Sequence, residues 1–339
     1  MSDSSSNSSP EMAIVGAGMA GLACAAQLRA AGVSVSVFDK GRRPGGRMST
    51  RAVDDRLSFD HGCQYFSAND PIFERQVQLW IDAGVASVWS GNVADLEDGR
   101  ITRKQTARAR YVGVPEMASV CSHLATKVDV RGGVDVNEAQ RMDNKWNLLN
   151  DKGTPLGQFD AVIVATPPAQ AEKLISRSSY LLAVVQSVKM SSCWTVMLAF
   201  QKRVGCSFEA AVVHNSPLSW IARNGSKTGR INTTDCWVGQ ARAAWSAQRL
   251  EASRDEIAAE LADEFCKAVG ISAKPNYLAG HRWKYAIPST PLDKQCLFDD
   301  TLNVGLCGDW CLGNRVEAAW LSGTAAADRV LSRVAKTAG

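Results

Sequence analysis

The sequence contains no uninterrupted apolar run close to the roughly 20 residues that a membrane-spanning helix needs, which argues against a membrane protein. Its first residues, MSDSSSNSSP, are rich in serine and lack the basic start and apolar centre of a secretory signal. We therefore expect a disordered tail at residues 1–10 and a cytoplasmic location. The net charge is only +4, and basic residues are scattered outside the run GRRPGGR, so nucleic acid is not an expected partner.

Metal ligands and nucleophilic constellations are also scarce. The chain has four histidines, and none of its ten cysteines forms a CxxC pair. Cys307 and Cys311 lack the further ligands that a structural zinc site needs, so we predict no metal and expect reduced thiols. No Ser-His-Asp or Cys-His arrangement stands in a recognisable context. With 339 residues, 45% of them hydrophobic and 21% charged, the chain has the composition of an ordinary two-lobed globular protein.

What the sequence does contain is a nucleotide-binding pattern near its start. The apolar run Met12–Val15 is followed by GAGMAG, a helical stretch of small residues, and a second apolar run ending in Asp39. The first glycine permits a tight turn, the second lets the backbone approach a pyrophosphate, and the third allows close helix packing. The acid is expected to bind a ribose hydroxyl. The residues predicted to contact the nucleotide here are Gly16, Gly18, Met19, Ala20, Gly21 and Asp39.

The residues that follow the acid favour FAD over NAD. KGRRPGGRMST resembles a segment of flavoproteins that bind two dinucleotides, such as the amine-oxidase and protoporphyrinogen-oxidase group, and DHGCQYF resembles the segment beneath the flavin ring of those proteins. A guanidinium at Arg47 would direct charge and donors to the pyrophosphate. A solvated basic loop remains the alternative for Arg42, and ordinary core packing for the aromatic residues. The cofactor contacts expected in these two segments are Lys40, Arg42, Gly46, Arg47, Met48, Gln64, Tyr65 and Phe66.

Two later segments fit the same plan. FDAVIVATPP is an apolar strand that stops at Thr166, and GDWCLGNRVEAAW leads into a helix of mostly small residues. In the same resemblance, the helix N-terminus points at the flavin, where its dipole would stabilise negative charge on the reduced ring. The cofactor contacts expected from these segments are Thr166, Gly308, Asp309, Val316, Glu317 and Ala318.

These interleaved motifs predict an α/β protein. We expect a Rossmann-like FAD domain built from residues 11–70, 126–172 and 296–339, and a substrate domain from residues 71–125 and 173–295. In the second lobe, SCWTVMLAF, AAVVHNSPLSWIA and DCWVGQA are typical of strands in a mainly antiparallel sheet, and SRDEIAAELADEFCKAVG is typical of a capped amphipathic helix.

The motifs YVGVPEM, WIARNGSK, HRWKYAIP and GDWCLGNRVEAAWLSG, taken in order, resemble the bacterial branch of the renalase family. Tyr111, Ile287 and Ala318 depart from that pattern, where Arg, Arg and Gly would be expected. The resemblance implies a non-covalent FAD, although His61 and Cys311 are residue types that can attach a flavin. It also implies oxidation of isomeric dihydronicotinamides (1,2-dihydro-NAD(P)) by hydride transfer to flavin N5, giving NAD(P)+ and, with O2 as acceptor, hydrogen peroxide.

For substrate contact we expect Tyr65, Asn224, His281, Trp283 and Tyr285. Trp and Tyr can pack on a flat nicotinamide, and Asn or His can hold its carboxamide. Core packing is the alternative for Trp283, and a structural histidine for His281. A flavin amine oxidase or a carotenoid- or protoporphyrinogen-type oxidoreductase would share every FAD motif, because these motifs specify the cofactor and not the substrate. A non-catalytic FAD-binding module is the third interpretation.

Overall fold

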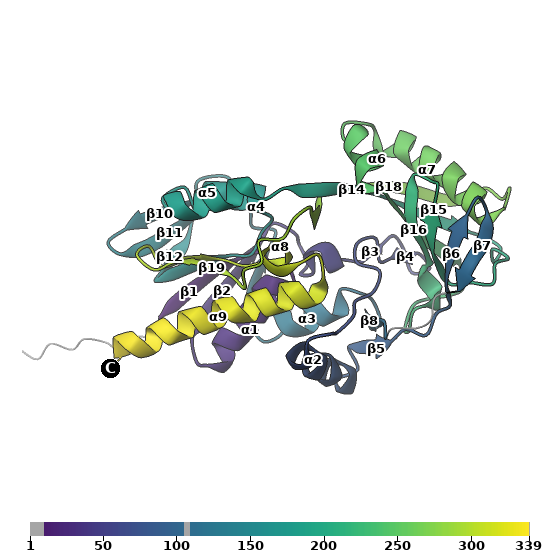
Figure 1. Cartoon of the computed structure of the whole chain (residues 1–339). Coiled ribbons are helices and arrows are strands. Elements are labelled where there is room, and N and C mark those ends of the chain that lie inside the picture. The colour runs from purple at the N-terminus through teal and green to yellow at the C-terminus, as the bar shows by residue number, and fades with distance from the viewer. Residues whose placement is uncertain (1–9, 105–108, 339) are drawn as a thin grey trace, which may run out of the picture. The chain divides into compact units, whose positions relative to one another are not determined.

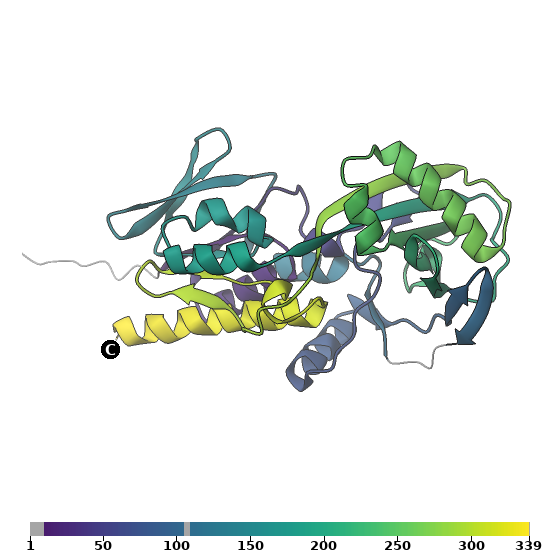
Figure 2. The same cartoon turned by 45° about the horizontal axis from the view of Figure 1, so that its top comes forward.

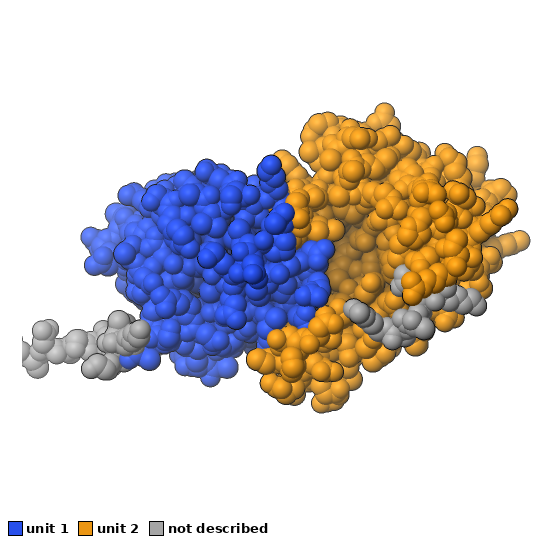
Figure 3. All heavy atoms as spheres, viewed as in Figure 1, with its two compact units in different colours: residues 1–46, 121–189, 290–339 blue, residues 47–120, 190–289 orange. Residues whose placement is uncertain are grey.

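The computed structural model describes residues 10–104 and 109–338, so most of the expected tail lies outside the described residues. The chain divides into two compact units, coloured separately in Figure 3. Unit 1 comprises residues 1–46, 121–189 and 290–339, and unit 2 comprises residues 47–120 and 190–289. The predicted α/β fold is confirmed, and each unit is assembled from separated segments of the chain.

Unit 1 contains a six-stranded sheet in the order β19-β20-β13-β1-β2-β9. Its strands are β1 (Glu11–Val15), β2 (Ser34–Asp39), β9 (Asp129–Gly132), β13 (Ala161–Val164), β19 (Leu297–Asp299) and β20 (Val304–Leu306). All neighbours pair in parallel except β19, which is antiparallel to β20. The strands β1 and β13 are almost entirely apolar and buried, as expected for central strands of a parallel sheet with both faces covered.

Two helices of unit 1, α1 (Met19–Ala30) and α9 (Val316–Ala338), lie side by side in Figures 1 and 2. Gly323 of α9 stands directly against α1, because a Cβ atom there would come within 2.1 Å of the Ala20 carbonyl oxygen. Ala326 and Ala327 are fully buried along the same helix. The small residues of this helix therefore allow two helix backbones to pack closely.

Further elements complete unit 1. An antiparallel three-stranded sheet is formed by β10 (Val136–Met142), β11 (Lys145–Asn150) and β12 (Pro155–Phe159). The short helices are α3 (Ser119–Ala125), at the chain boundary with unit 2, α4 (Pro168–Ala171), η2 (Glu172–Leu174), α5 (Ser179–Ser187) and α8 (Asp309–Leu312). The α5 helix is anchored to β19 by a 2.6 Å hydrogen bond from the Ser178 hydroxyl to Asp299 Oδ2.

Unit 2 is built on a seven-stranded sheet in the order β18-β14-β17-β16-β15-β6-β7. The strands are β6 (Val93–Glu97), β7 (Arg100–Lys104), β14 (Met190–Phe200), β15 (Ala210–His214), β16 (Leu218–Arg223), β17 (Asp235–Ala241) and β18 (Tyr277–Pro288). Only the β6–β15 pair is parallel, so the mainly antiparallel sheet is confirmed.

The two faces of this sheet are covered differently. One face carries Trp194, Val196 and Leu198 and packs on α7 (Arg254–Val269), which crosses the sheet in Figure 2. The predicted cap of α7 is present as a capping box between Ser253 and Glu256. On the other face, Phe59 covers a smaller apolar cluster of β14 and β17 residues.

The remaining elements of unit 2 are short. They are η1 (Gly46–Met48), β3 (Arg51–Ala52), β4 (Ser58–Phe59), α2 (Pro71–Asp82), β5 (Ala86–Val88), β8 (Tyr111–Gly113), η3 (Asn224–Ser226) and α6 (Ala243–Gln248). The β3–β4 hairpin brings Phe59 onto the sheet. None of the described helices is both long enough and apolar enough to cross a membrane.

The compact units do not follow the expected domain boundaries. Residues 47–70 belong to unit 2, because Phe59 packs on its sheet and Asp60 is held by its side chains. Residues 173–189 belong to unit 1, because α5 packs beside β19. The assignment of unit 1 to FAD and of unit 2 to substrate stays a prediction.

Candidate functional site

The glycine turn of unit 1 has the geometry of a phosphate cradle. Gly16 has φ of +113°, and a Cβ atom there would lie 2.9 Å from the Ala165 carbonyl oxygen. A Cβ atom on Gly21 would lie 1.9 Å from the Gly16 carbonyl oxygen, so only glycine lets α1 begin this close to the turn. Gly18, in contrast, has no atom within 4 Å of its Cβ position. Protein atoms therefore pack tightly against Gly16 and Gly21, whereas the space beside Gly18 is empty, which fits a bound pyrophosphate.

Asp39 orders this turn directly. Its Oδ2 atom accepts a 2.6 Å hydrogen bond from the Ala17 N–H, and its Oδ1 atom accepts one of 2.6 Å from the Gly41 N–H. A carboxylate has about four acceptor positions, so two remain for the predicted ribose hydroxyls. The sequence motif indicated the ribose contact but gave no sign of the bond to the turn.

The GRRPGGR segment closes over the same turn. The Gly45 N–H donates to the Ala17 carbonyl at 2.9 Å, and a Cβ atom on Gly46, whose φ is +53°, would stand 3.4 Å from Gly18 Cα. Lys40 and Arg42 are exposed. Arg47, which begins unit 2, donates through Nη1 to the Ala286 carbonyl at 3.0 Å. Met48 is buried, and its predicted flavin contact stays untested.

The C-terminal segments of unit 1 meet at the end of β13. The Gly308 N–H donates to Ser322 Oγ at 3.0 Å, and the Trp310 indole donates to the Thr166 carbonyl at 3.3 Å. The Thr166 hydroxyl is buried and has no hydrogen-bond partner among the described residues. Together with the open face at Gly18, this unpartnered hydroxyl fits a unit that holds an FAD molecule.

The first turn of α9 contains the predicted cofactor residues Val316, Glu317 and Ala318. Ala318 is 3% exposed, and its Cβ lies 3.9 Å from the position that a Cβ on Gly313 would occupy. Glu317 is also buried and pairs with Arg315 at 3.6 Å. A carboxylate in the first turn interacts favourably with the positive end of the helix dipole, so it reduces the field that a flavin would feel there.

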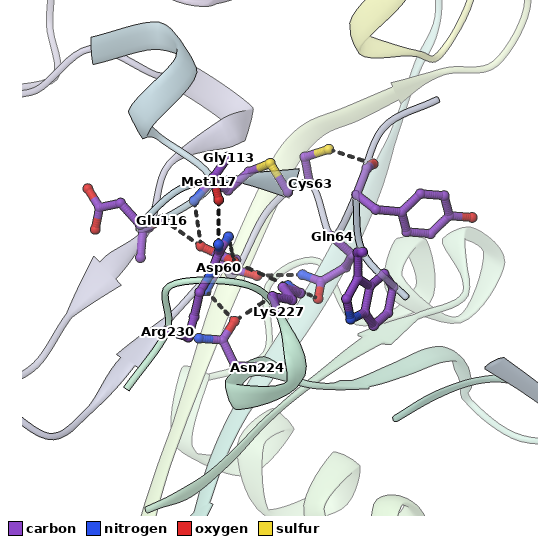
Figure 4. A network of polar contacts seen from close by, with 12 residues as sticks. Asp60, Cys63, Gln64, Gly113, Glu116, Met117, Asn224, Lys227 and Arg230 are labelled. Carbon is purple, nitrogen blue, oxygen red and sulfur yellow. Dashed lines mark hydrogen bonds and ion pairs between the residues drawn. The ribbon is translucent and has the colours of Figure 1, made fainter. Parts of the chain in front are cut away.

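The strongest polar cluster of unit 2 surrounds Asp60 (Figure 4). This fully buried carboxylate accepts hydrogen bonds through Oδ2 from Lys227 Nζ at 3.2 Å and from Arg230 Nη2 at 2.7 Å and Nε at 3.1 Å. Its Oδ1 accepts from Thr50 Oγ1 at 2.7 Å and from the Met117 N–H at 3.0 Å. Burial acts to raise the pKa of Asp60, but the two cations outweigh it and hold the pKa well below its usual range. We call Asp60, Lys227 and Arg230 with their partners the Asp60 network.

Two residues predicted to bind ligands, Asn224 and Gln64, are hydrogen-bonded within this network. The Asn224 amide donates to the Ser58 carbonyl at 2.9 Å and accepts through Oδ1 from the Asp60 N–H at 3.2 Å. The Gln64 amide donates to the Asp60 and Gly62 carbonyls and accepts from Lys227 Nζ at 3.2 Å. Both side chains hold segment 60–65 in place, which makes positioning their evident role.

A row of side chains crosses the sheet of unit 2 beside this segment. The strand register pairs His281 with Thr195, Thr195 with Gln240, and Gln240 with Trp220. Register partners share a face, so these four residues form a line across β18, β14, β17 and β16. Gln240 Nε2 donates to the Gly62 carbonyl at 2.7 Å and so ties segment 60–65 to the row. We call these four residues the sheet row.

Aromatic rings gather at both ends of the sheet row. At one end, the centroids of His61 and His281 lie 4.6 Å apart, and the Trp283 ring lies 5.1 Å from His61 and 4.5 Å from His281. The Trp283 indole donates to the His61 carbonyl at 3.0 Å, so this predicted substrate residue also has a structural bond.

At the other end of the row, Tyr65 lies 5.5 Å from Trp220 and 6.1 Å from Trp89, and the Arg110 guanidinium stands 5.4 Å from the Tyr65 centroid. The structure therefore brings three predicted residues, Tyr65, His281 and Trp283, to one face of one sheet.

His61 and His281, which pack together at one end of the sheet row, are both electrically neutral near pH 7. Burial lowers the pKa of His61 to about 4, although nearby backbone carbonyls act in the opposite direction. Burial, reinforced by the neighbouring His61, lowers the pKa of His281 to about 4. Neutral imidazoles can donate and accept hydrogen bonds without adding charge.

Two other predicted residues lie apart from this group. Phe66 is 3% exposed, and its ring packs on Phe73 and Trp80 of α2 and on Tyr111 of β8. Tyr285 lies in a bulged part of β18, with Lys284 Nζ 5.6 Å from its ring. Sequence reasoning missed Asp60, Lys227, Arg230, Gln240 and Thr195, because their partners are distant in the chain.

The chain is similar to known proteins in two of its parts. A family described as NAD(P)-binding Rossmann-like domain matches residues 14–78, and a family described as flavin containing amine oxidoreductase matches residues 100–331.

Solved structures share the fold at low identity. A "Putative protoporphyrinogen oxidase" from Exiguobacterium sp. 255-15 has a TM-score of 0.78 at 12% identity, covering 95% of this chain and 99% of that one. Wild-type putrescine oxidase bound to putrescine has a TM-score of 0.72 at 14% identity, covering 96% and 99%. A variant of that oxidase redesigned in cofactor binding reaches 0.74, at the same identity and coverage.

Proposed function

The chain belongs to the family of flavin-containing amine oxidoreductases, and on this premise we propose that it oxidises isomeric dihydronicotinamides of the 1,2-dihydro-NAD(P) type. The coarser statement, an FAD-dependent oxidoreductase of small molecules, follows from the family itself. The assignment of 1,2-dihydro-NAD(P) as substrate rests on the sequence resemblance to bacterial renalases and on the aromatic rings and neutral histidines that surround the sheet row. The products would be NAD(P)+ and, with O2 as acceptor, hydrogen peroxide.

The observation that carries the proposal is that, among the described residues, the face lined by the rings of His61, His281, Trp283, Tyr65 and Trp220 offers no buried carboxylate without a cationic partner. His61 and His281 both have a pKa near 4, and tryptophan and tyrosine supply the remaining rings. Within the described part of unit 2, the acidic side chains that are buried, Asp60 and Asp235, are each paired with an arginine. A flat, uncharged ring suits this face better than a cationic amine, which would seek a free carboxylate.

The residues of unit 2 would bind and orient the substrate without transferring a proton. FAD, when bound, would supply the two-electron acceptor for the hydride that the dihydronicotinamide gives up as its ring regains aromaticity. Trp283 and Tyr65 would pack on the substrate ring, and His281, in its neutral form, would hold a polar substituent by hydrogen bonding. Holding the reacting carbon in position is the main contribution asked of the protein, because the reaction needs no general base.

Amine oxidation is the second candidate, and the family description and the putrescine oxidase likeness favour it. A cationic diamine would need an anionic anchor, and the network around Asp60 already neutralises its carboxylate. Oxidation of a protoporphyrinogen-like substrate is favoured by the other structural likeness alone.

Anaerobic stopped-flow spectroscopy distinguishes these candidates. The FAD-loaded protein is mixed separately with 1,2-dihydro-NAD(P), with ordinary NADH and NADPH, and with a panel of mono- and diamines, while flavin bleaching is followed. We expect rapid bleaching by the 1,2-dihydro isomer and a rate that is flat between pH 6 and 8.5. Ordinary NADH carries its hydride at C4, and such a misplacement can cost about 100-fold in rate. Bleaching by an amine and by neither isomer would overturn the proposal.

A further inference from the structure

Two indoles flank the same tyrosine and differ in one respect. Trp89 and Trp220 have ring centroids 6.1 Å and 5.5 Å from that of Tyr65. The Trp89 N–H donates to the Ser226 hydroxyl at 3.2 Å. The Trp220 N–H is buried and has no hydrogen-bond partner among the residues that the structure describes. Because the residue is only 9% exposed, solvent has little access to this donor.

A buried indole N–H without a partner is unusual. Tryptophan normally satisfies its N–H when buried, and an unpaired donor loses its hydration without compensation. An indole only donates, so its missing partner must be an acceptor. The unmade bond therefore points to a ligand that brings an acceptor atom.

The sheet row gives this donor its context. Trp220 is paired in register with Gln240 and stands on the same face as Thr195 and His281. The Thr195 hydroxyl is also fully buried and makes no hydrogen bond of ordinary geometry; its polar neighbour is the Cys193 thiol, which is a weak partner. On this face the Trp220 N–H therefore has no partner and the Thr195 hydroxyl has only a weak one. The carboxylate of the neighbouring Asp60, in contrast, is fully hydrogen-bonded.

We propose that the Trp220 indole N–H is the specificity-determining donor of this site and binds the carbonyl oxygen of the substituent on a planar substrate ring. This inference rests on the proposed function and deepens it, because a nicotinamide ring carries such a carbonyl in its carboxamide. Tyr65 packs against the indole and holds its plane, so the donor is oriented before the ligand arrives. The site would discriminate against a ring that lacks the acceptor, because the indole would then stay unpaired.

The test is a binding comparison that does not depend on turnover. Calorimetry on the FAD-loaded protein measures the dissociation constants of NAD+ and of its analogue in which hydrogen replaces the carboxamide. We expect the wild-type protein to prefer NAD+ by about 10-fold or more, as one hydrogen bond to a buried donor would give. In Trp220→Phe, which keeps a ring beside Tyr65, this preference should fall to about 3-fold or less.

Trp89→Phe is the matched control. It removes an indole N–H beside the same tyrosine, but one that Ser226 already satisfies. We expect it to keep the wild-type preference for the carboxamide. An equal loss of preference in both variants would show that ring packing is responsible and would overturn the inference.

The outcomes separate this inference from the function on which it rests. If the 1,2-dihydro isomer reduces the flavin but Trp220→Phe keeps the wild-type preference, the inference fails and the function stands. If neither that isomer reduces the flavin nor NAD+ binds, both fail.

Discussion

The Asp60 network and the sheet row both adjoin residues 60–65 of unit 2, but they differ in how completely their buried polar atoms are hydrogen-bonded. In the network, the buried carboxylate of Asp60 accepts from Thr50, the Met117 N–H, Lys227 and Arg230. In the row, the Trp220 N–H is buried without a hydrogen bond, and the buried Thr195 hydroxyl has only the Cys193 thiol as a weak partner. Buried polar groups whose hydrogen bonds are all made hold the backbone in place, whereas buried groups without partners lower stability unless a ligand supplies the missing hydrogen bonds. The contrast distinguishes the part of unit 2 that positions the segment from the part that we propose to bind substrate.

The largest effect is expected from breaking the network. Asp60→Ala removes the carboxylate and leaves Lys227 and Arg230 buried without their partner. Breaking a buried ion pair in this way costs about 3–5 kcal/mol of unfolding free energy. Chemical denaturation of wild type and variant measures the difference.

The control for this prediction is an exposed ion pair. Asp129 pairs with Arg131 at 3.0 Å, but both side chains are about half exposed. Asp129→Ala should therefore change the unfolding free energy by less than about 1 kcal/mol. Similar losses in Asp60→Ala and Asp129→Ala would contradict the description of a saturated, buried network.

The same contrast between filled and open space occurs in the glycine turn of unit 1. A methyl group on Gly21 would collide with the Gly16 carbonyl oxygen, whereas one on Gly18 would meet nothing within 4 Å. Gly21→Ala should therefore lower the unfolding free energy of the FAD-free protein by about 1–3 kcal/mol or more. Gly18→Ala should leave that stability nearly unchanged and weaken FAD binding by about 10-fold, because the methyl group keeps phosphate from the backbone N–H groups.

Flavin fluorescence titration and thermal unfolding of the FAD-free protein measure these two effects separately. If Gly18→Ala binds FAD with wild-type affinity, the turn is not the phosphate cradle that we infer.

Sequence alone predicted what depends on short stretches of chain. The strand, turn and helix around Gly16, the capped helix α7 and the antiparallel strands of unit 2 all follow local patterns of apolar, glycine and capping residues. Lys227 and Arg230 could not be predicted as partners of Asp60, because 167 and 170 residues separate them along the chain. The sheet row depends on strand register, which includes a bulge between Leu218 and Trp220. Asn224 is expected to hold a substrate carboxamide from the chemistry of its amide, and the sequence gives no sign of its hydrogen bond with the Asp60 N–H, which comes from a residue 164 positions away.

Acid should weaken the packing of His61 and His281 before it weakens the Asp60 network. His61 and His281 have a folded-state pKa of about 4, below the ordinary 6.5, so their contribution to stability is fully present above pH 6.5. It is lost as the pH falls from 6.5 towards 4, because the unfolded chain binds protons more readily. The Asp60 contribution is lost only below its ordinary pKa of 3.8.

We expect His281→Phe to reduce the fall in unfolding free energy between pH 6.5 and pH 5 by about 1 kcal/mol, since the imidazole is partly exposed. Denaturation at a series of pH values tests this, with the exposed His214→Asn as control. An unchanged pH dependence in His281→Phe would show that this imidazole is as easily protonated in the folded protein as in the unfolded chain.

The smallest effect is expected at Gln240, which joins the two regions. Its side chain belongs to the sheet row, but its Nε2 atom donates to the Gly62 carbonyl at 2.7 Å and so holds the segment that the Asp60 network fixes. That carbonyl also accepts from Gln64 Nε2 at 3.1 Å, so Gln240→Leu leaves it with a partner. The loss of unfolding free energy should therefore stay near 1 kcal/mol or below. Because Tyr65 lies three residues beyond Gly62, even a small shift of the segment should change the packing of Tyr65 on Trp220, which tryptophan fluorescence can follow in Gln240→Leu with Trp220→Phe as reference. If Gln240→Leu costs as much stability as Asp60→Ala, the row and the network are one cooperative unit, and the distinction between positioning residues and substrate residues on this face would have to be abandoned.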